Sequence, residues 1–275
     1  MDAFAATLHH AYRVAVEAAV EAGRVLRWHF RRGLEIHYKG EIDLVTEADL
    51  AAEQVLISRI REAFPDHQLL SEESGEILQR SPWLWVVDPL DGTTNFAHGF
   101  PVFSVSIALL HEGQRVLGVV YDVMRDELFA ARRGEGAFLN GRPIRVSRTS
   151  RLEAALLVTG FPYDRQESPF DNTREFVALL KRCHGVLRVG SAALDLAAVA
   201  AGRLDGYWEF RLSPWDLAAG ALLVEEAGGR VTTPTGDPLP PLATDIVATN
   251  GRIHEELLEA LAAARRCLTE GGRSV

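Results

Sequence analysis

The first 64 residues carry apolar positions at helical spacing. Phe4, Leu8 and the alanines and aliphatic residues that follow recur every three or four positions, which predicts an amphipathic helix over residues 2–32 that stops at Gly33. A second helix is expected to run to Phe64, with Thr46 as its N-cap and Asp49 at the capping-box position. A short strand is expected next, at 68–70.

The pattern then changes to a period of two, which is typical of strands. Predicted strands are 83–87, 103–110, 115–123, 127–131, 137–139 and 144–146. Asn140-Gly141 favours a tight hairpin between the last two strands. We expect an antiparallel meander that packs against the two opening helices.

Beyond residue 147 strands alternate with helices. The expected strands are 155–159, 186–189, 205–209, 229–233 and 245–249, and the expected helices are 170–182, 192–201, 214–227 and 253–267. The pattern predicts a layered α/β sandwich, of the mixed α+β and α/β type, in two lobes that span residues 1–146 and 147–275.

Composition narrows the class of protein. The chain has 275 residues, 47% of them hydrophobic, which is enough to bury a full core. Its net charge of −9 disfavours nucleic acid or an anionic membrane as the main partner. The only cysteines, Cys183 and Cys267, form no CxxC motif. With no signal-peptide pattern and no apolar run long enough to span a bilayer, we expect a cytoplasmic protein.

The first candidate for chemistry lies directly after the apolar run Trp83–Val87. Asp88 and Asp91 supply hard oxygen ligands, and the carbonyl of Leu90 lies between them in the sequence. Gly92 and Thr93 leave backbone N–H groups free to face an anion. The proline and glycine beside these acids predict that the strand ends at Asp88. The alternative is an ordinary Asp-Pro and Asp-Gly turn without chemistry.

Further acids are expected at comparable places in the fold. Asp216 follows Ser213 and Pro214 at the start of an apolar helix, where it could simply complement the helix N-terminus. Glu72 follows the strand at 68–70, where it could be a solvated turn residue. If these acids meet Asp88 and Asp91, their repulsion requires cations, and Mg²⁺ suits carboxylates that share a phosphate.

Several motifs occur in a characteristic order. They are Asp43–Asp49 (DLVTEAD), Glu72–Ser74 (EES), Asp88–Asn95 (DPLDGTTN), Gly190–Ala193 (GSAA), Trp215–Gly220 (WDLAAG) and Glu226–Gly229 (EAGG). Together they resemble the signature motifs of the inositol monophosphatase family, which belongs to the lithium-sensitive, magnesium-dependent sugar phosphatases. The resemblance covers nearly the whole chain and implies a layered α/β sandwich.

The resemblance also implies a metal-ligand set. Glu72, Asp88 and the Leu90 carbonyl would hold a first Mg²⁺, and Asp88, Asp91 and Asp216 a second. Two such ions can clamp the attacking and leaving oxygens of an in-line displacement.

The catalytic roles follow from the same resemblance. A water at the first metal, oriented by Glu72 and by the Thr93 hydroxyl, would attack phosphorus, while Asp49 polarises that hydroxyl. Asp49 could instead act only as a capping-box acid. The Gly92 and Thr93 amides would hold the phosphate. Lys39 and Asp43 match, together with Asp49, a segment that closes over the phosphate and helps a third, weaker metal.

Substrate hydroxyls would be read by Asp91, Glu209 and the segment formed by Gly190, Ser191 and Ala192. Glu209 could instead be a surface acid at a strand end. Arg211 could contact the substrate or a neighbouring subunit, and the resemblance implies a homodimer.

The first function hypothesis is a Mg²⁺-dependent phosphomonoesterase acting on myo-inositol monophosphates. Fructose 1,6-bisphosphate, histidinol phosphate or an adenosine 3′,5′-bisphosphate would use the same chemistry, with selectivity in loops 161–170 and 209–213. A hypothesis from another class is a regulatory protein on the same fold that acts through a partner such as RNA-associated machinery. Broken metal ligands or a basic surface would favour it, and the sequence shows neither.

Overall fold

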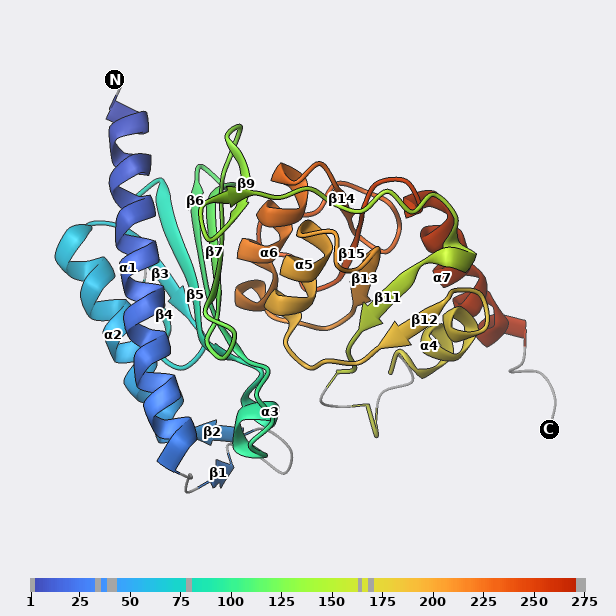
Figure 1. Cartoon of the computed structure of the whole chain (residues 1–275), viewed down its shortest axis with the longest axis horizontal. Helices are drawn as coiled ribbons and strands as arrows, with labels where there is room; N and C mark the ends of the chain where they lie inside the picture. Colours follow the sequence, from blue (N-terminus) through green and yellow to red (C-terminus); the bar gives the residue numbers. More distant parts are fainter. Residues whose placement is uncertain are drawn as a thin grey trace.

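The fold is a stack of helical and sheet layers. The computed structural model describes residues 3–32, 36–38, 44–77, 81–162, 165–167 and 171–270. Figure 1 shows a pair of helices on one side, then a sheet, a central pair of helices, a second sheet and an outer pair of helices. The predicted layered α/β sandwich is therefore confirmed.

Helices α1 (Ala3–Arg32) and α2 (Glu47–Ala63) form the first layer, close to their predicted bounds. The buried stripe of α1 is mostly alanine, including Ala11, Ala15 and Ala18, so that α1 can pack closely on its neighbours. A small hairpin, β1 (Ile36–Tyr38) and β2 (Leu44–Thr46), links the two helices and was not predicted. The side chains of residues 33–46 lie outside the described set, so the Thr46 cap stays a prediction.

The first sheet contains eight strands in the order β10-β9-β8-β7-β6-β5-β3-β4. They are β3 (Gln68–Ser71), β4 (Gly75–Ile77), β5 (Trp83–Asp91), β6 (Ser104–His111), β7 (Gln114–Asp122), β8 (Glu127–Arg132), β9 (Gly136–Leu139) and β10 (Arg142–Pro143). Apart from the parallel pair β3–β5, neighbours are antiparallel, so the predicted meander is confirmed.

Tight turns set the register of the meander. Asn140 and Gly141 both have positive φ, 49° and 75°, as a two-residue hairpin turn requires. Strand β10 pairs Arg142 with Leu139 directly after this turn. The strand predicted at 144–146 was therefore placed two residues too late.

Strand β5 is longer than the strand predicted at 83–87. Strand β5 continues through Asp88 to Asp91 instead of stopping at Asp88. Its pairing with β6 shifts register between Asp88 and Asp91, which is where Pro89 stands. A proline has no N–H to donate to a ladder, and a bulge accommodates it while the strand continues. The strand therefore delivers both carboxylates on its own backbone.

The second sheet contains five strands in the order β12-β11-β13-β15-β14. They are β11 (Leu156–Thr159), β12 (Gly185–Leu187), β13 (Gly206–Glu209), β14 (Arg230–Thr232) and β15 (Ile246–Thr249). Strand β11 is parallel to both β12 and β13, so these three strands end at the same edge of the sheet. All five lie within or close to the ranges predicted from the sequence.

Helices α4 (Thr173–Leu180) and α7 (His254–Glu270) cover the outer face of this sheet. Leu179, Leu257 and Leu261 from these helices pack with Leu157 and Trp208 of the strands. Both helices match predicted ones, whereas the short 3₁₀ turn at Leu152–Ala154 was not predicted.

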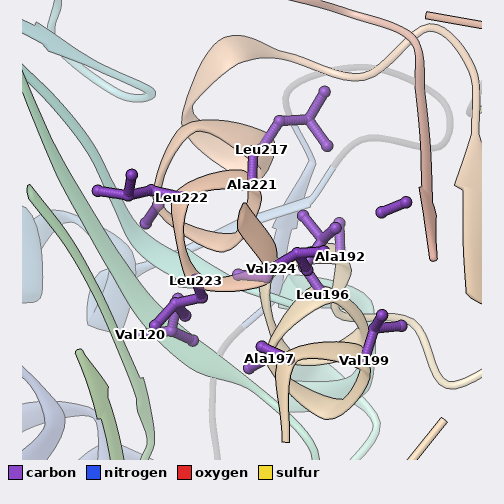
Figure 2. Packing of buried hydrophobic residues seen from close by; sticks show 14 of the residues in the cluster. Val120, Ala192, Leu196, Ala197, Val199, Leu217, Ala221, Leu222, Leu223 and Val224 are labelled. Carbon is purple, nitrogen blue, oxygen red and sulfur yellow. The ribbon is translucent and has the colours of Figure 1, made fainter. Parts of the chain in front are cut away.

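Helices α5 (Ala192–Ala200) and α6 (Pro214–Glu226) lie between the sheets. Apolar side chains point from them in several directions, as expected of buried helices, and Figure 2 shows Leu223 of α6 beside Val120 of β7. This core also contains Tyr207 of the second sheet. Because the core includes residues from both sides of residue 147, the two-lobe division stays a prediction.

Two glycines permit the close contacts of α6. A Cβ at Gly118 of β7 would lie 2.6 Å from the carbonyl oxygen of Ala219, and one at Gly220 would lie 2.5 Å from Cβ of Leu196 on α5. Both positions are therefore too tight for a side chain. These contacts fix α6 against the first sheet and against α5.

None of the described helices is both long enough and apolar enough to cross a membrane.

Candidate active site

A polar cavity of about 510 Å³ lies where the layers meet. Its walls come from the end of β5, the start of α3 (Thr93–Ala97), the N-termini of α5 and α6, and the segment after β13. The cavity brings together nearly all the site residues predicted from the sequence, namely Glu72, Asp88, Leu90, Asp91, Gly92, Thr93, Gly190, Ser191, Ala192, Glu209, Arg211 and Asp216. Asp49 reaches the same place through Thr93.

The turn from β5 into α3 orders the first motif. The Leu90 N–H donates to Asp88 Oδ1 at 2.9 Å, and the Thr93 hydroxyl donates to the Leu90 carbonyl at 3.0 Å. Gly92 has a φ of 101°, and a Cβ there would lie 3.1 Å from the Val102 carbonyl oxygen. The chain therefore needs glycine at this position to turn sharply from the carboxylates into the helix.

Asp91 joins the first motif to the N-terminus of α5. Its Oδ2 accepts hydrogen bonds from the Ser191 hydroxyl at 2.5 Å and from the Ala193 N–H at 2.9 Å, and its Oδ1 accepts one from the Ala192 N–H at 3.2 Å. Ser191 is itself the N-cap of α5. A helix N-terminus favours a carboxylate, so this contact holds Asp91 in one orientation.

Asp216 has the capping geometry expected from the sequence and also faces the cavity. Its Oδ2 accepts a 2.7 Å hydrogen bond from the Ser213 N–H, which completes a capping box at the start of α6. The helix-capping and site hypotheses therefore do not exclude each other. The cap orients the carboxylate, and the other oxygen remains available for a ligand.

Asp88, Asp91 and Asp216 each place a carboxylate oxygen within 4.8 Å of the others. Burial raises the pKa of Asp88 well above its ordinary value, and the negative charges of Glu72, Asp91 and Asp216 raise it further. Burial and the charge of Asp91 likewise raise the pKa of Asp216. A buried group of oxygen ligands that repel one another fits divalent hard cations, which would offset this repulsion.

Thr93 links this group to Asp49. The Asp49 side chain is buried, and its Oδ1 lies 3.3 Å from the Thr93 hydroxyl oxygen as a hydrogen-bond acceptor. The predicted contact between these two residues is present. The hydroxyl also lies near the Leu90 carbonyl, beside the candidate metal ligands.

Glu209 lines the cavity from the last position of β13. It is only 8% exposed, so the alternative of a surface acid is wrong. The Tyr207 hydroxyl donates to its Oε2 at 2.7 Å. Burial raises the pKa of Glu209 to about 7, although the bond from Tyr207 opposes this shift.

Several residues of this region were not identified from the sequence. Arg165 and Arg188 line the cavity, and the buried Asp195 on α5 interacts electrostatically with Glu209. Each of the two arginines follows the end of a strand, which is a signal the sequence carries. Lys39 and Asp43 lie outside the described residues, so their predicted roles are not tested.

The sequence matches a model of the inositol monophosphatase family over residues 7–270. The chain belongs to this family. Its members are metal-dependent phosphatases, and the cluster of three aspartates is a site that can hold a metal ion. The protein is therefore an enzyme of the phosphoric monoester hydrolase class.

Individual relatives agree with the family assignment. An inositol-1-monophosphatase from Synechocystis is 50% identical over 91% of this chain and 88% of its own length. Nus factor SuhB from Escherichia coli is 45% identical over 91% of this chain and 95% of its own length. The solved structure of an inositol monophosphatase from Anabaena superposes with a TM-score of 0.86 at 49% identity, covering 94% of this chain and 97% of that one.

Proposed function

We propose that the protein is a Mg²⁺-dependent phosphomonoesterase that hydrolyses myo-inositol monophosphates. The observation that carries this proposal is the meeting of Asp88, Asp91 and Asp216 within 4.8 Å in a cavity that Thr93 and Glu72 also line. The inositol monophosphatases among the relatives support the choice of substrate.

The family resemblance and the lining of the cavity together suggest the following roles. Glu72, Asp88 and the Leu90 carbonyl would hold one Mg²⁺, and Asp88, Asp91 and Asp216 a second. When bound, the ions supply positive charge that activates water, orients the phosphate and stabilises the departing oxygen. A third, weaker ion near Asp49 is part of the same proposal.

Thr93 and Asp49 position the nucleophile. The Thr93 hydroxyl has one hydrogen and lies within reach of both Asp49 and the Leu90 carbonyl. When that hydrogen is donated to Asp49, the lone pairs of the oxygen remain free to accept a hydrogen bond from water. Glu72, half-buried on the cavity wall, orients the same water and receives its proton.

The far wall of the cavity binds the polyol. Glu209 presents a buried carboxyl held by Tyr207, and the segment Gly190–Ala192 contributes the rigid backbone of a helix N-terminus. Asn95 keeps that segment in place, since its side-chain amide donates to the carbonyls of Val189 at 2.8 Å and Gly190 at 3.3 Å. Fixed hydrogen-bonding groups of this kind orient a hydroxylated ring.

A regulatory role through a partner is the competing function, since relatives named Nus factor SuhB are 45% to 47% identical to this chain. The complete set of acidic residues in the cavity and the net charge of −9 favour the phosphatase. We also expect a cytoplasmic, lithium-sensitive homodimer, as the family resemblance implies. Light scattering during gel filtration tests the dimer.

The test is phosphate release by the purified protein with Mg²⁺ or with chelator. The substrates are inositol 1-phosphate, fructose 1,6-bisphosphate, histidinol phosphate and adenosine 3′,5′-bisphosphate. We expect chelator-sensitive release that is fastest on the inositol ester. Faster release from another ester would overturn the substrate assignment alone, and no release from any ester would refute the phosphatase.

A further inference from the structure

A buried carboxylate on α2 lies next to the loop that carries Glu72. Glu53 is only 4% exposed, and its neighbours on the buried stripe of α2 are the core residues Ala52 and Leu56. An acidic side chain in an apolar stripe is costly unless it is well hydrogen-bonded. The position of Glu53 is therefore explained by its hydrogen bonds and not by packing.

The hydrogen bonds of this carboxylate come from residues 71–74. Its Oε1 accepts the Ser71 hydroxyl and the backbone N–H groups of Glu73 at 3.1 Å and Ser74 at 2.9 Å. Its Oε2 accepts the Ser74 hydroxyl at 2.5 Å. An ionised carboxylate offers acceptors alone, so it suits four converging donors, and its bonds are stronger than those between neutral groups.

The residues that Glu53 binds flank Glu72 on both sides. Strand β3 ends at Ser71, which lies opposite Gly75 in the antiparallel pair with β4. Residues 72–74 therefore form a three-residue hairpin loop, and Glu72 is its first residue. Because Glu53 holds the residue before Glu72 and the two residues after it, the backbone of Glu72 has a fixed position.

Glu72 itself faces the carboxylates of the cavity. It lines the cavity wall, and its side chain shares a hydrogen bond with that of Asp88. Asp88, Asp91 and Asp216 are each oriented by a backbone N–H group. The loop that Glu53 holds gives Glu72 a comparable fixed orientation.

Helix α2 contributes another buried acid to the same region. Asp49 and Glu53 are four residues apart, so their side chains leave α2 on the same face. Asp49 accepts the Thr93 hydroxyl at 3.3 Å. One face of α2 therefore contacts both the turn that carries Thr93 and the loop that carries Glu72.

We propose that Glu53 is a positioning residue of the active site, whose carboxylate holds the loop of residues 71–74 so that Glu72 faces Asp88. Glu53 is not among the described residues that line the cavity, so it acts through Glu72. This inference rests on the proposed function, because it takes Glu72 as a ligand of the first Mg²⁺. Residues that orient a metal ligand typically change metal affinity about 10- to 100-fold.

The test measures binding of Mn²⁺, which prefers the same oxygen ligands as Mg²⁺, by the electron paramagnetic resonance signal of the free ion. The variants are Glu53→Leu, Glu72→Gln and the double variant. We expect Glu53→Leu to weaken Mn²⁺ binding about ten-fold or more. In the Glu72→Gln background the same change should alter the affinity less than about two-fold, because the ligand that Glu53 positions is already lost. A purely structural role would lower the affinity by the same factor in both backgrounds.

Glu175→Leu is the matched control. Glu175 is a buried glutamate on α4, outside the cavity and ion-paired with Arg265 at 2.9 Å. Its loss should lower the melting temperature and change the Mn²⁺ affinity less than about two-fold. Glu53→Gln keeps an acceptor oxygen for the loop and should retain most of the affinity. If Glu53→Leu does not fold, Ser74→Ala removes one donor at an exposed position and should weaken Mn²⁺ binding about three-fold, again only where Glu72 is present.

Wild-type affinity in Glu53→Leu would overturn the inference, and so would an equal loss with and without Glu72. Where Glu53→Leu does not fold, unchanged affinity in Ser74→Ala would overturn it. Equal Mn²⁺ binding by the wild type and Glu72→Gln would also do so, while phosphate release by the wild type would leave the proposed function standing. If the expected coupling is found but no ester is hydrolysed, the phosphatase is refuted and the positioning role stands.

Discussion

The carboxylate of Asp91 accepts a hydrogen bond from the Ser191 hydroxyl, 100 positions away in the chain, at 2.5 Å. The same carboxylate accepts hydrogen bonds from the backbone N–H groups of Ala192 and Ala193 in the first turn of α5. One side of Asp91 is thus committed to the helix. These hydrogen bonds hold the candidate metal ligand Asp91 in one direction whether or not a cation is bound.

The first prediction concerns this contact. Ser191→Ala removes the hydroxyl that orients Asp91, so we expect the affinity for Mg²⁺ to fall about ten-fold or more. Loss of the N-cap should lower the free energy of unfolding by about 1 kcal/mol. The measurement is phosphate release against Mg²⁺ concentration. Ser191→Thr keeps a hydroxyl and should restore most of the affinity, and a Thr variant as weak as Ala would argue against this role.

Thr93 provides the second prediction. Thr93→Val keeps the shape of the side chain and removes the hydroxyl, so kcat should fall about 100-fold or more while the melting temperature changes little. Thr93→Ser keeps the hydroxyl near Asp49 and should retain most of the activity. A valine variant with normal kcat would exclude Thr93 from positioning the nucleophile.

The third prediction follows from the pKa of Glu209, about 7 in the fold against an ordinary value of 4.5. Between these values the folded chain binds more protons than the unfolded chain, so Glu209 makes stability fall as pH rises toward 7. Glu209→Gln removes this dependence. With chelator present, the free energy of unfolding of the wild type should fall between pH 5.5 and pH 8 by about 2 kcal/mol more than that of the variant.

Urea denaturation at the two pH values measures this difference. Glu153→Gln changes an exposed glutamate and is the control. The pH dependence of its free energy of unfolding should differ much less from that of the wild type. A constant difference between wild type and Glu209→Gln at both pH values would mean that Glu209 has an ordinary pKa.

The fourth prediction tests how packing positions the site. A Cβ at Gly220 would meet Leu196 Cβ at 2.5 Å, so Gly220→Ala must push α6 away from α5. We expect a loss of about 1–3 kcal/mol in the free energy of unfolding and weaker Mg²⁺ binding, because the two helices carry Asp216 and Ser191. Gly228→Ala is a control for the loss of stability alone. A Cβ at this position would contact no other atom, so the substitution is unfavourable only because of the positive φ. Unchanged stability in Gly220→Ala would show that the helices can separate freely.

Most elements of the fold could be predicted because their signals are local. The 30-residue helix α1 repeats its alanine stripe over many turns, and Asn140-Gly141 needs no distant contact to favour a hairpin. Strand β5 is different. Its continuation past Pro89 depends on pairing with β6 through a bulge, which is a tertiary contact that no local pattern reveals.

The residues of the candidate site also differ in whether the sequence alone identifies them. Asp88, Asp91 and Asp216 could be identified because they recur in motifs that resemble those of a family. Arg188 and Asp195 belong to no quoted motif. Only the order of the strands brings Arg188 to the cavity, and only the burial of α5 places Asp195 where it interacts with Glu209. The hydrogen bonds that Asp91 makes to α5 likewise depend on how the two sheets pack around the central helices.

The most direct test of the account is release of phosphate from inositol 1-phosphate as Mg²⁺ is added to chelator-treated protein. We compare the wild type with Asp88→Asn, which keeps the size of the side chain, and with Asp237→Asn in a surface loop as the control. We expect Mg²⁺-dependent release by the wild type and the control, and a loss of at least about 100-fold in Asp88→Asn. Equal release by all three proteins, or release that persists without Mg²⁺, would contradict it.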